Sequence, residues 1–315
     1  MRNRLVFVCF VFSACGAGPG VLQPVGIGDL GPNYTAVLAE ASPGPRARVL
    51  ASGVAQLETL TETKGPVDVQ LATERTAIEP GRALTVGLII RHDPGYHTYW
   101  RFPGVVGLAT RIRWSLPPGF RVGPLRWARP ERSRMASYGV WGYRRDVALL
   151  TEIIPPSDLI VGQCVEVRAD AAWMACAKDC NPGFKSFSLR VPVARKSLAR
   201  PSTRLFESMR RQSAVVSDAW SFVAERTASG YRLLATPQKG AVAVHDAYLF
   251  NSNALVDSNQ EQVFSRASKG GFVLGLSRWE YAEASGLLVG ILASEHPLTE
   301  SGQRYLIVRA RLRTQ

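Results

Sequence analysis

Two cysteines, Cys176 and Cys180, have the spacing in this sequence that is best suited to chemistry. Three residues separate them, and the strand that is expected before them gives way to an Asn-Pro-Gly turn directly after Cys180. A disulfide can join two cysteines only where the backbone brings their Cα atoms within about 7 Å, and a turn that starts here can do so. The segment therefore predicts either a disulfide or a pair of neighbouring thiols.

Three kinds of chemistry are open to this pair. The first is a structural disulfide in a non-catalytic β-sandwich protein that binds a partner, but closing a loop of about five residues stabilises a fold by only about 2 kcal/mol. A redox-active pair is the second and is favoured, because one thiolate can attack a partner's disulfide and the other can resolve the product. In that case Lys178 would favour the thiolate and Asp179 would oppose it. The third is a Cu(I) site made by the soft sulfur ligands of Met174, Cys176 and Cys180, since Met174 and Cys176 share one face of an extended strand.

An aromatic segment upstream is the second candidate component of a site. Tyr96, Tyr99 and Trp100 can cover the cysteine loop and keep water and small oxidants away from a thiolate, or they can pack in the core. His97 lies among them and has the same two interpretations, a thiolate-stabilising group or a structural histidine. Both interpretations stay open at the level of sequence.

Another cysteine, Cys164, lies at the start of the strand that leads to the pair. We expect it to be a buried, inert thiol, with membership of the redox set as the alternative.

The elements that must position these residues are predicted to be strands. Apolar residues alternate with polar ones in many short runs separated by Pro/Gly turns, which indicates an all-β chain with an antiparallel β-sandwich. A short basic helix is expected over residues 204–212. The predicted organisation is a β-sandwich over 66–197, a linker over 198–217 and a second β-rich domain over 218–315.

The N-terminus has the three parts of an export signal. Arg2 and Arg4 precede an apolar run over residues 5–12, and small residues follow up to Ala17. The end of this run resembles a bacterial lipobox that would leave a lipidated Cys15, and general cleavage near Ala17 is the alternative. We therefore expect a signal peptide over 1–17, a flexible tether over 18–65, and a periplasmic or exported protein whose compartment permits disulfides.

Composition excludes several other functions. The 315 residues carry a formal net charge of +13, but no Lys/Arg run concentrates it, which disfavours nucleic-acid binding. The sequence contains no run of 18 apolar residues, so we expect no ordinary membrane-spanning helix. There is no Ser/His/Asp signature, no Gly-rich phosphate loop and no His spacing typical of a metal site, so no cofactor is expected.

A family resemblance rests on several separate motifs in order. These are Ile-Glu-Pro-Gly at 78–81, His-Asp-Pro-Gly-Tyr-His-Thr-Tyr-Trp at 92–100, Pro-Gly at 103–104, Arg-Trp-Ser-Leu-Pro-Pro-Gly-Phe at 113–120, Tyr-Gly at 138–139, and Trp173 with Cys176, Cys180 and Pro182. Together they make residues 67–193 resemble the N-terminal periplasmic domain of DsbD-type thiol:disulfide interchange proteins, especially the ScsB-like branch. The C-terminal portion resembles the second β domain of that branch more weakly.

The resemblance implies an immunoglobulin-like sandwich in the periplasm. It implies that Cys176 and Cys180 accept reducing equivalents and pass them to thioredoxin-fold proteins, the chemistry that serves cytochrome c biogenesis and copper tolerance. Two departures stand out. Phe102 and Val105 occupy places where the family often has Asn and Asp, and the chain ends at Gln315 without a membrane domain or a thioredoxin-like domain. A membrane thiol electron donor is therefore expected to act in trans.

Overall fold

The computed structural model describes residues 23–24 and 65–313. The expected signal peptide and lipidated Cys15 lie outside these residues, as does most of the expected tether. Strand β1 (Gln23–Pro24) pairs with β5 at the edge of a sheet. No helix in the described part is both long and apolar enough to span a membrane.

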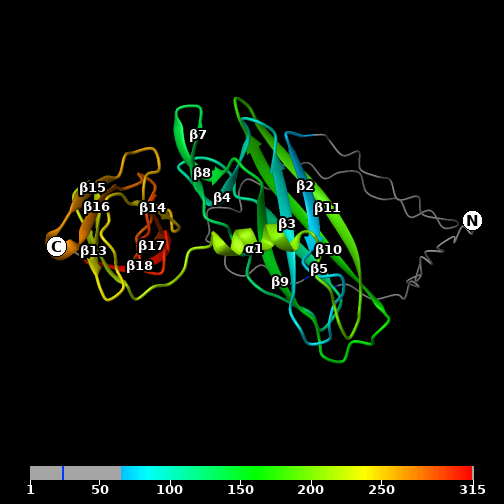
Figure 1. Cartoon of the computed structure of the whole chain (residues 1–315). Coiled ribbons are helices and arrows are strands. Elements are labelled where there is room, and N and C mark those ends of the chain that lie inside the picture. The colour runs from blue at the N-terminus through cyan, green and yellow to red at the C-terminus, as the bar shows by residue number, and fades with distance from the viewer. Residues whose placement is uncertain (1–22, 25–64, 314–315) are drawn as a thin grey trace, which may run out of the picture.

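The first part of the structure is a sandwich of two sheets (Figure 1). One sheet has the order β1-β5-β10-β4-β8-β7, with β11 paired to β10, and the other has the order β2-β3-β9-β6. Apart from β1, their strands are β2 (Val67–Thr73), β3 (Leu84–His92), β4 (His97–Gly104), β5 (Arg111–Leu116), β6 (Arg121–Val122), β7 (Glu131–Met135), β8 (Tyr138–Tyr143), β9 (Val147–Ile154), β10 (Cys164–Cys176) and β11 (Cys180–Pro192). Alternate apolar side chains from both sheets meet in one core, as the period of two predicts.

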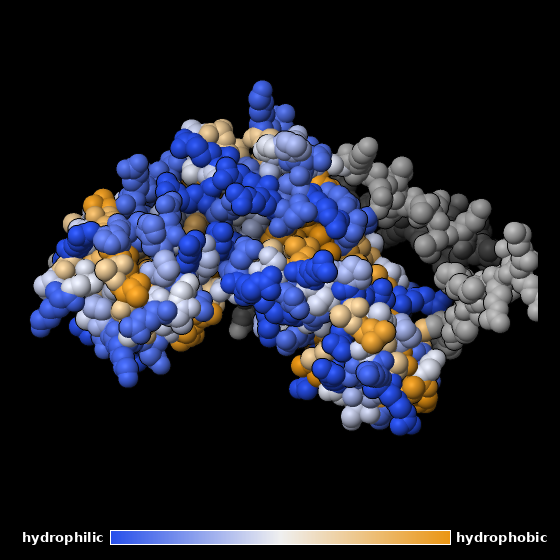
Figure 2. All heavy atoms as spheres, in the orientation of Figure 1, coloured by the Kyte–Doolittle hydropathy of each residue, from blue (hydrophilic) through white to orange (hydrophobic). Residues whose placement is uncertain are grey.

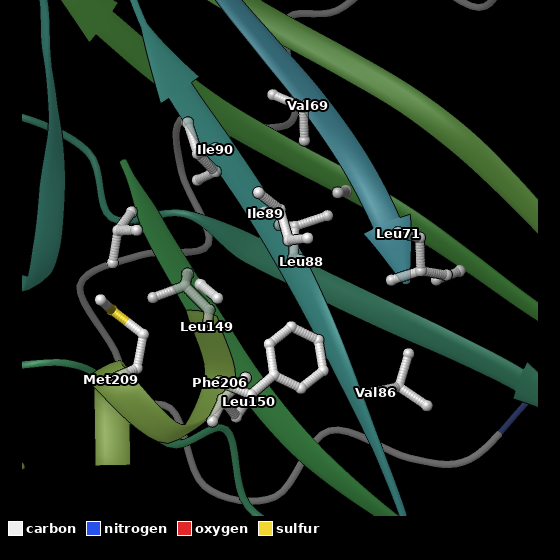
Figure 3. Close-up of a cluster of buried hydrophobic side chains, with 14 of the residues drawn as sticks. Val69, Leu71, Val86, Leu88, Ile89, Ile90, Leu149, Leu150, Phe206 and Met209 are labelled. Carbon is white, nitrogen blue, oxygen red and sulfur yellow. The ribbon is translucent and has the colours of Figure 1, made fainter. Parts of the chain in front are cut away.

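The helix α1 (Thr203–Arg211) covers part of this sandwich and is not a free linker. Its Phe206 is fully buried against Gly87 of β3, where a Cβ would lie 2.4 Å from the Phe206 ring. Figure 3 shows Phe206 and Met209 reaching from the helix toward Leu150 and Leu149 of β9. The expected basic helix is thus present, and its apolar face belongs to the sandwich core.

The C-terminal β unit, residues 218–313, forms a third sheet with a core of its own. Its order is β14-β17-β18-β12-β13-β16-β15, in which only the β12–β18 pairing is parallel. The strands are β12 (Trp220–Arg226), β13 (Gly230–Pro237), β14 (Tyr248–Asn251), β15 (Val263–Arg266), β16 (Phe272–Ser277), β17 (Leu287–Ala293) and β18 (Tyr305–Arg313). The predicted all-β fold, a sandwich followed by a second β-rich part, is confirmed.

The two units share an aromatic contact. Phe250 of β14 packs edge-on against Trp100 of β4 and Trp141 of β8, with ring centroids 6.5 and 6.0 Å apart. The Trp141 indole N–H also donates to the Tyr248 hydroxyl at 3.0 Å. Figure 1 shows β4, β7 and β8 at the end of the sandwich that faces the C-terminal unit. Packed side chains thus connect the two units. The domain limits of 66–197, 198–217 and 218–315 stay a prediction.

The exterior agrees with the basic composition. The face drawn in Figure 2 is mainly hydrophilic, and its hydrophobic patches are small.

Candidate functional site

The cysteine pair closes a β-hairpin. Strands β10 and β11 pair along their whole length, and Cys176 opposite Cys180 is the last pair of the register. A disulfide joins the two residues, whose Cα atoms are 4.1 Å apart. The connecting turn is held by a hydrogen bond of 3.0 Å from the Ala177 N–H to the Asp179 carbonyl. Both sulfurs are thus presented at the tip of a long, rigid hairpin.

The structure differs from the sequence prediction in where the turn lies. Asn181, Pro182 and Gly183 belong to β11 and do not form a turn. A proline is tolerated there because β11 is an edge strand paired only with β10, so its outer edge needs no N–H donor. Trp173 lies directly opposite Gly183, and its ring fills the space that a side chain at Gly183 would take. The turn proper is the short segment between the two cysteines.

The two ends of the disulfide have different access to solvent. Cys176 is 0% exposed, whereas Cys180 is an exposed residue at the start of β11. An attacking thiolate must approach a sulfur directly. The end of the disulfide that offers such an approach is therefore Cys180.

Cys176 lies in a small hydrophobic cluster that is separate from the two main cores. Its buried members are Cys176, Tyr99 of β4 and Val140 of β8. Val106, Met135 and Met174, all half-buried, pack against them. We call these six residues the cysteine cluster. They come from four strands and a loop that only the sheet order β10-β4-β8-β7 brings together.

Tyr99 covers one side of the cluster. Its side chain is 1% exposed and its hydroxyl has no hydrogen-bond partner, and burial raises its pKa to about 12. The phenol is therefore neutral near pH 7. Gly107 rests on the ring, since a Cβ there would lie 2.2 Å from a ring carbon, and Ala109 forms a β-bridge with Tyr99. We call residues 104–109 the cover segment, because they lie over Tyr99 and supply Val106 to the cysteine cluster.

His97 is the ionisable group placed beside Cys176. The two residues are directly opposite each other in the β4–β10 register, which puts their Cβ atoms on one face about 5 Å apart. His97 is 2% exposed, its ring packs edge-on against Tyr99 at 5.1 Å, and its Nε2 has no partner. Burial, with a smaller contribution from the positive charge of Arg144, lowers the pKa of His97 below its ordinary value. The imidazole is therefore mostly neutral at pH 7 and able to accept a proton.

The remaining predicted residues are distributed differently. Trp100 points away from the cysteines into the main core, because it follows Tyr99 and so occupies the opposite face of β4. Tyr96 is half-buried in the turn before β4, and Lys178 and Asp179 are exposed in the hairpin turn. Among the predicted aromatic residues, the structure brings Tyr99 into the cysteine cluster. Sequence reasoning missed Val106, Met135 and Val140, which carry no local signal that relates them to the cysteines.

Cys164 is disulfide-bonded and half-buried. The expectation of an inert free thiol at this position is therefore wrong.

A soft-metal site has some of its ligands in place. Met174 and Met135 both pack against the cysteine cluster, and Met174 lies two residues before Cys176 on the same strand. Within residues 65–313, no three His, Cys, Asp or Glu side chains converge in a way that would hold a metal ion. Reduction of the disulfide would be required before either cysteine could serve as a thiolate ligand.

A second histidine, the half-buried His92, makes the stability of this region depend on pH. His92 Nε2 lies 2.9 Å from the Thr98 hydroxyl, and burial lowers the pKa of His92 to about 4. The unfolded chain binds a proton below about pH 6.5, but folded His92 stays neutral down to about pH 4. Its contribution to stability is therefore complete above pH 6.5 and is lost as the pH falls toward 4.

The unfolding free energy of the unsubstituted protein is expected to fall by about 2 kcal/mol more than that of His92→Gln when the pH is lowered from about 7.5 to 5, as measured by urea denaturation. An equal acid loss in both proteins would contradict this role.

The site and fold define a class of protein: an immunoglobulin-like β-sandwich that presents a disulfide at a hairpin tip, with one cysteine buried and one exposed. The sequence profile of the family described as "Thiol:disulfide interchange protein DsbD, N-terminal" matches residues 66–192. Residues 66–192 are therefore a DsbD-type N-terminal domain.

Solved structures add a likeness of fold. The crystal structure of the N-terminal periplasmic domain of ScsB from Proteus mirabilis is similar with a TM-score of 0.52 at 16% identity, and the match covers 78% of this chain and 93% of that one. The major pilin subunit BcpA of Bacillus cereus matches with a TM-score of 0.26 at 9% identity, over 78% of this chain and 69% of that one. A search of curated protein sequences found no match.

Proposed function

We propose that this protein exchanges disulfides with thioredoxin-fold partners and relays reducing equivalents through Cys176 and Cys180. The observation that carries the proposal is the hairpin-tip disulfide with one exposed end and one buried end, within a domain of the DsbD type. Such an arrangement lets a partner reach one sulfur while the surrounding fold shelters the other.

The exchange would run in two balanced halves. A donor dithiol attacks Cys180 Sγ, the Cys176–Cys180 bond breaks, and Cys176 leaves as a thiolate that takes up a proton. The donor's second thiolate then attacks the mixed disulfide, so that the donor leaves oxidised and both cysteines are reduced. In the second half, the Cys180 thiolate attacks a client disulfide, and Cys176 resolves the mixed disulfide and restores the original bond. Two electrons pass from donor to client in each cycle.

Neutral His97 suits the proton transfers at Cys176. It can accept the thiol proton when Cys176 attacks and return it when Cys176 leaves, because its unpartnered Nε2 lies on the same buried face. Lys178 in the exposed turn would favour the thiolate of Cys180, with Asp179 opposing it.

The proposed compartment is the periplasm, where disulfides persist. A membrane thiol protein is the proposed electron donor. Attachment to the membrane through a lipidated Cys15 is part of the same proposal, and that residue lies outside the described part of the chain.

Equilibration with thiol redox buffers tests this function. The Cys176–Cys180 bond is expected to have a reduction potential above about −300 mV, because a pair that cycles must be more easily reduced than a structural disulfide. Mass spectrometry after acid quenching would report the reduced fraction of this pair separately from that of Cys164. A potential well below −300 mV would support the structural interpretation of the bond and contradict the relay.

Anaerobic titration of the reduced protein with Cu(I) addresses the alternative use of the same sulfurs. The observation that favours it is the presence of two thioethers, those of Met135 and Met174, in the cysteine cluster. Tight stoichiometric binding that is lost in Met174→Leu would support copper handling. Weak binding that is insensitive to this substitution would leave disulfide exchange as the function of the pair.

A further inference from the structure

A loop of the C-terminal β unit contacts two segments that supply residues to the cysteine cluster. The loop lies between β14 and β15, and its central residues are Asp257, Ser258 and Asn259. Ser258 is 8% exposed although it belongs to a surface loop. Its burial arises because the sandwich contacts it from two directions.

Three hydrogen bonds join this loop to the sandwich. The Ser258 hydroxyl accepts from the Val105 N–H at 2.9 Å and donates to the Gly139 carbonyl at 2.6 Å. The Asn259 side-chain oxygen accepts from the Gly139 N–H at 2.9 Å. One hydroxyl thus connects the cover segment to the β7–β8 hairpin, and both backbone groups of Gly139 are bonded to the C-terminal unit.

The backbones approach so closely here that only glycine fits. A Cβ on Gly104 would lie 2.2 Å from the Ser258 hydroxyl, and a Cβ on Gly139 would lie 2.5 Å from the Ser258 carbonyl. Gly104 also has a φ of +97°, a region that other residues rarely adopt. The loop is therefore closely fitted to both segments.

Both segments that Ser258 connects supply residues to the cysteine cluster. On one side, the cover segment supplies Val106 to the cysteine cluster and rests on Tyr99 through Gly107. On the other side, the β7–β8 hairpin supplies Val140 and Met135. Displacement of either segment would open the packing around Cys176. Cys180 lies outside this cluster and is already exposed.

We propose that the C-terminal β unit controls access to the buried half of the disulfide, with Ser258 as the positioning residue that holds the cover segment and the β7–β8 hairpin closed over Cys176. This inference rests on the proposed function for its biological meaning, since it assigns the second unit a regulatory part in the exchange. The closed arrangement would keep Cys176 from small thiols and oxidants until a partner engages Cys180.

Alkylation of single thiols in the full chain tests the inference without any partner. In a Cys180→Ala background, Ser258→Ala is expected to raise the rate at which iodoacetamide modifies Cys176 by about 5- to 30-fold, the factor that corresponds to losing one or two net hydrogen bonds that oppose a local opening. In a Cys176→Ala background, the same substitution is expected to leave the modification of Cys180 unchanged. Peptide mass spectrometry would assign each modified cysteine.

Two further variants complete the experiment. Gly139→Ala removes no hydrogen-bonding atom but forces the loop away from the hairpin, so it should also speed modification of Cys176. Ser265→Ala, at an exposed position on β15, is the matched control and should have no effect. An unchanged Cys176 rate in Ser258→Ala, or an equal rise for Cys176 and Cys180, would overturn the inference. Neither result depends on the reduction potential, so failure here is distinct from failure of the relay.

Discussion

Cys176→Ala is expected to accumulate a mixed disulfide with a thioredoxin-fold protein, whereas Cys180→Ala is expected to form almost none. The exposed Cys180 can attack or be attacked, and with Cys176 removed no thiol remains in the pair to resolve the product. The buried Cys176 alone can react only through a local opening of the cysteine cluster. An opening free energy of about 3 kcal/mol would slow its reaction about 100-fold relative to Cys180.

A suitable probe is purified thioredoxin in which the resolving cysteine is replaced by alanine. Its remaining thiol is activated as a mixed disulfide with thionitrobenzoate. Non-reducing electrophoresis and the release of the coloured leaving group would give both the product and its rate. The double variant lacking both cysteines is the control for reaction at other sites. A faster reaction of Cys180→Ala than of Cys176→Ala would reverse the assignment of the attacking residue.

Substitution of Tyr99 is expected to have the second largest effect. Tyr99→Ala removes a fully buried aromatic ring, which costs about 3 to 5 kcal/mol of unfolding free energy, and it leaves Gly107 and Val106 without their support over Cys176. Reduction of the pair by dithiothreitol should therefore become faster. Urea denaturation and the time course of reduction, followed by mass spectrometry, would measure the two effects.

Tyr99→Phe is the matched control for this substitution. It keeps the ring but removes a buried hydroxyl that has no hydrogen-bond partner, so the unfolding free energy should be unchanged or higher by about 1 kcal/mol. Exchange with a partner should be retained. If Tyr99→Phe loses exchange while its stability is intact, the hydroxyl takes part in the chemistry and Tyr99 is more than a cover.

Local sequence patterns were sufficient for the class of fold and for the cysteine pair. The alternation in β2 and β18 directly reflects one buried face and one solvated face, and a hairpin brings Cys176 and Cys180 together through neighbouring backbone alone. The same patterns failed at β4 and β7. Strand β4 has four successive buried residues because its two faces pack against different clusters. Strand β7 alternates half-buried with exposed residues, but its first four residues are all polar or charged, so its sequence shows no alternation of apolar with polar residues.

The surroundings of the disulfide were decided by tertiary structure. Met135, Val140 and Val106 share one cluster with Cys176 only because the sheet places β4, β8 and β7 in that order, and register on one sheet depends on pairing between distant segments. The difference in burial between Cys176 and Cys180 arises in the same way, since cross-strand neighbours cover one and not the other. Ser258 reaches the cover segment from more than 100 residues away along the chain. Local sequence is enough to identify the atoms that can react, because two thiols on one short turn are neighbours along the chain. Solvent access to each sulfur depends on packing, and packing depends on contacts between segments that are remote in sequence.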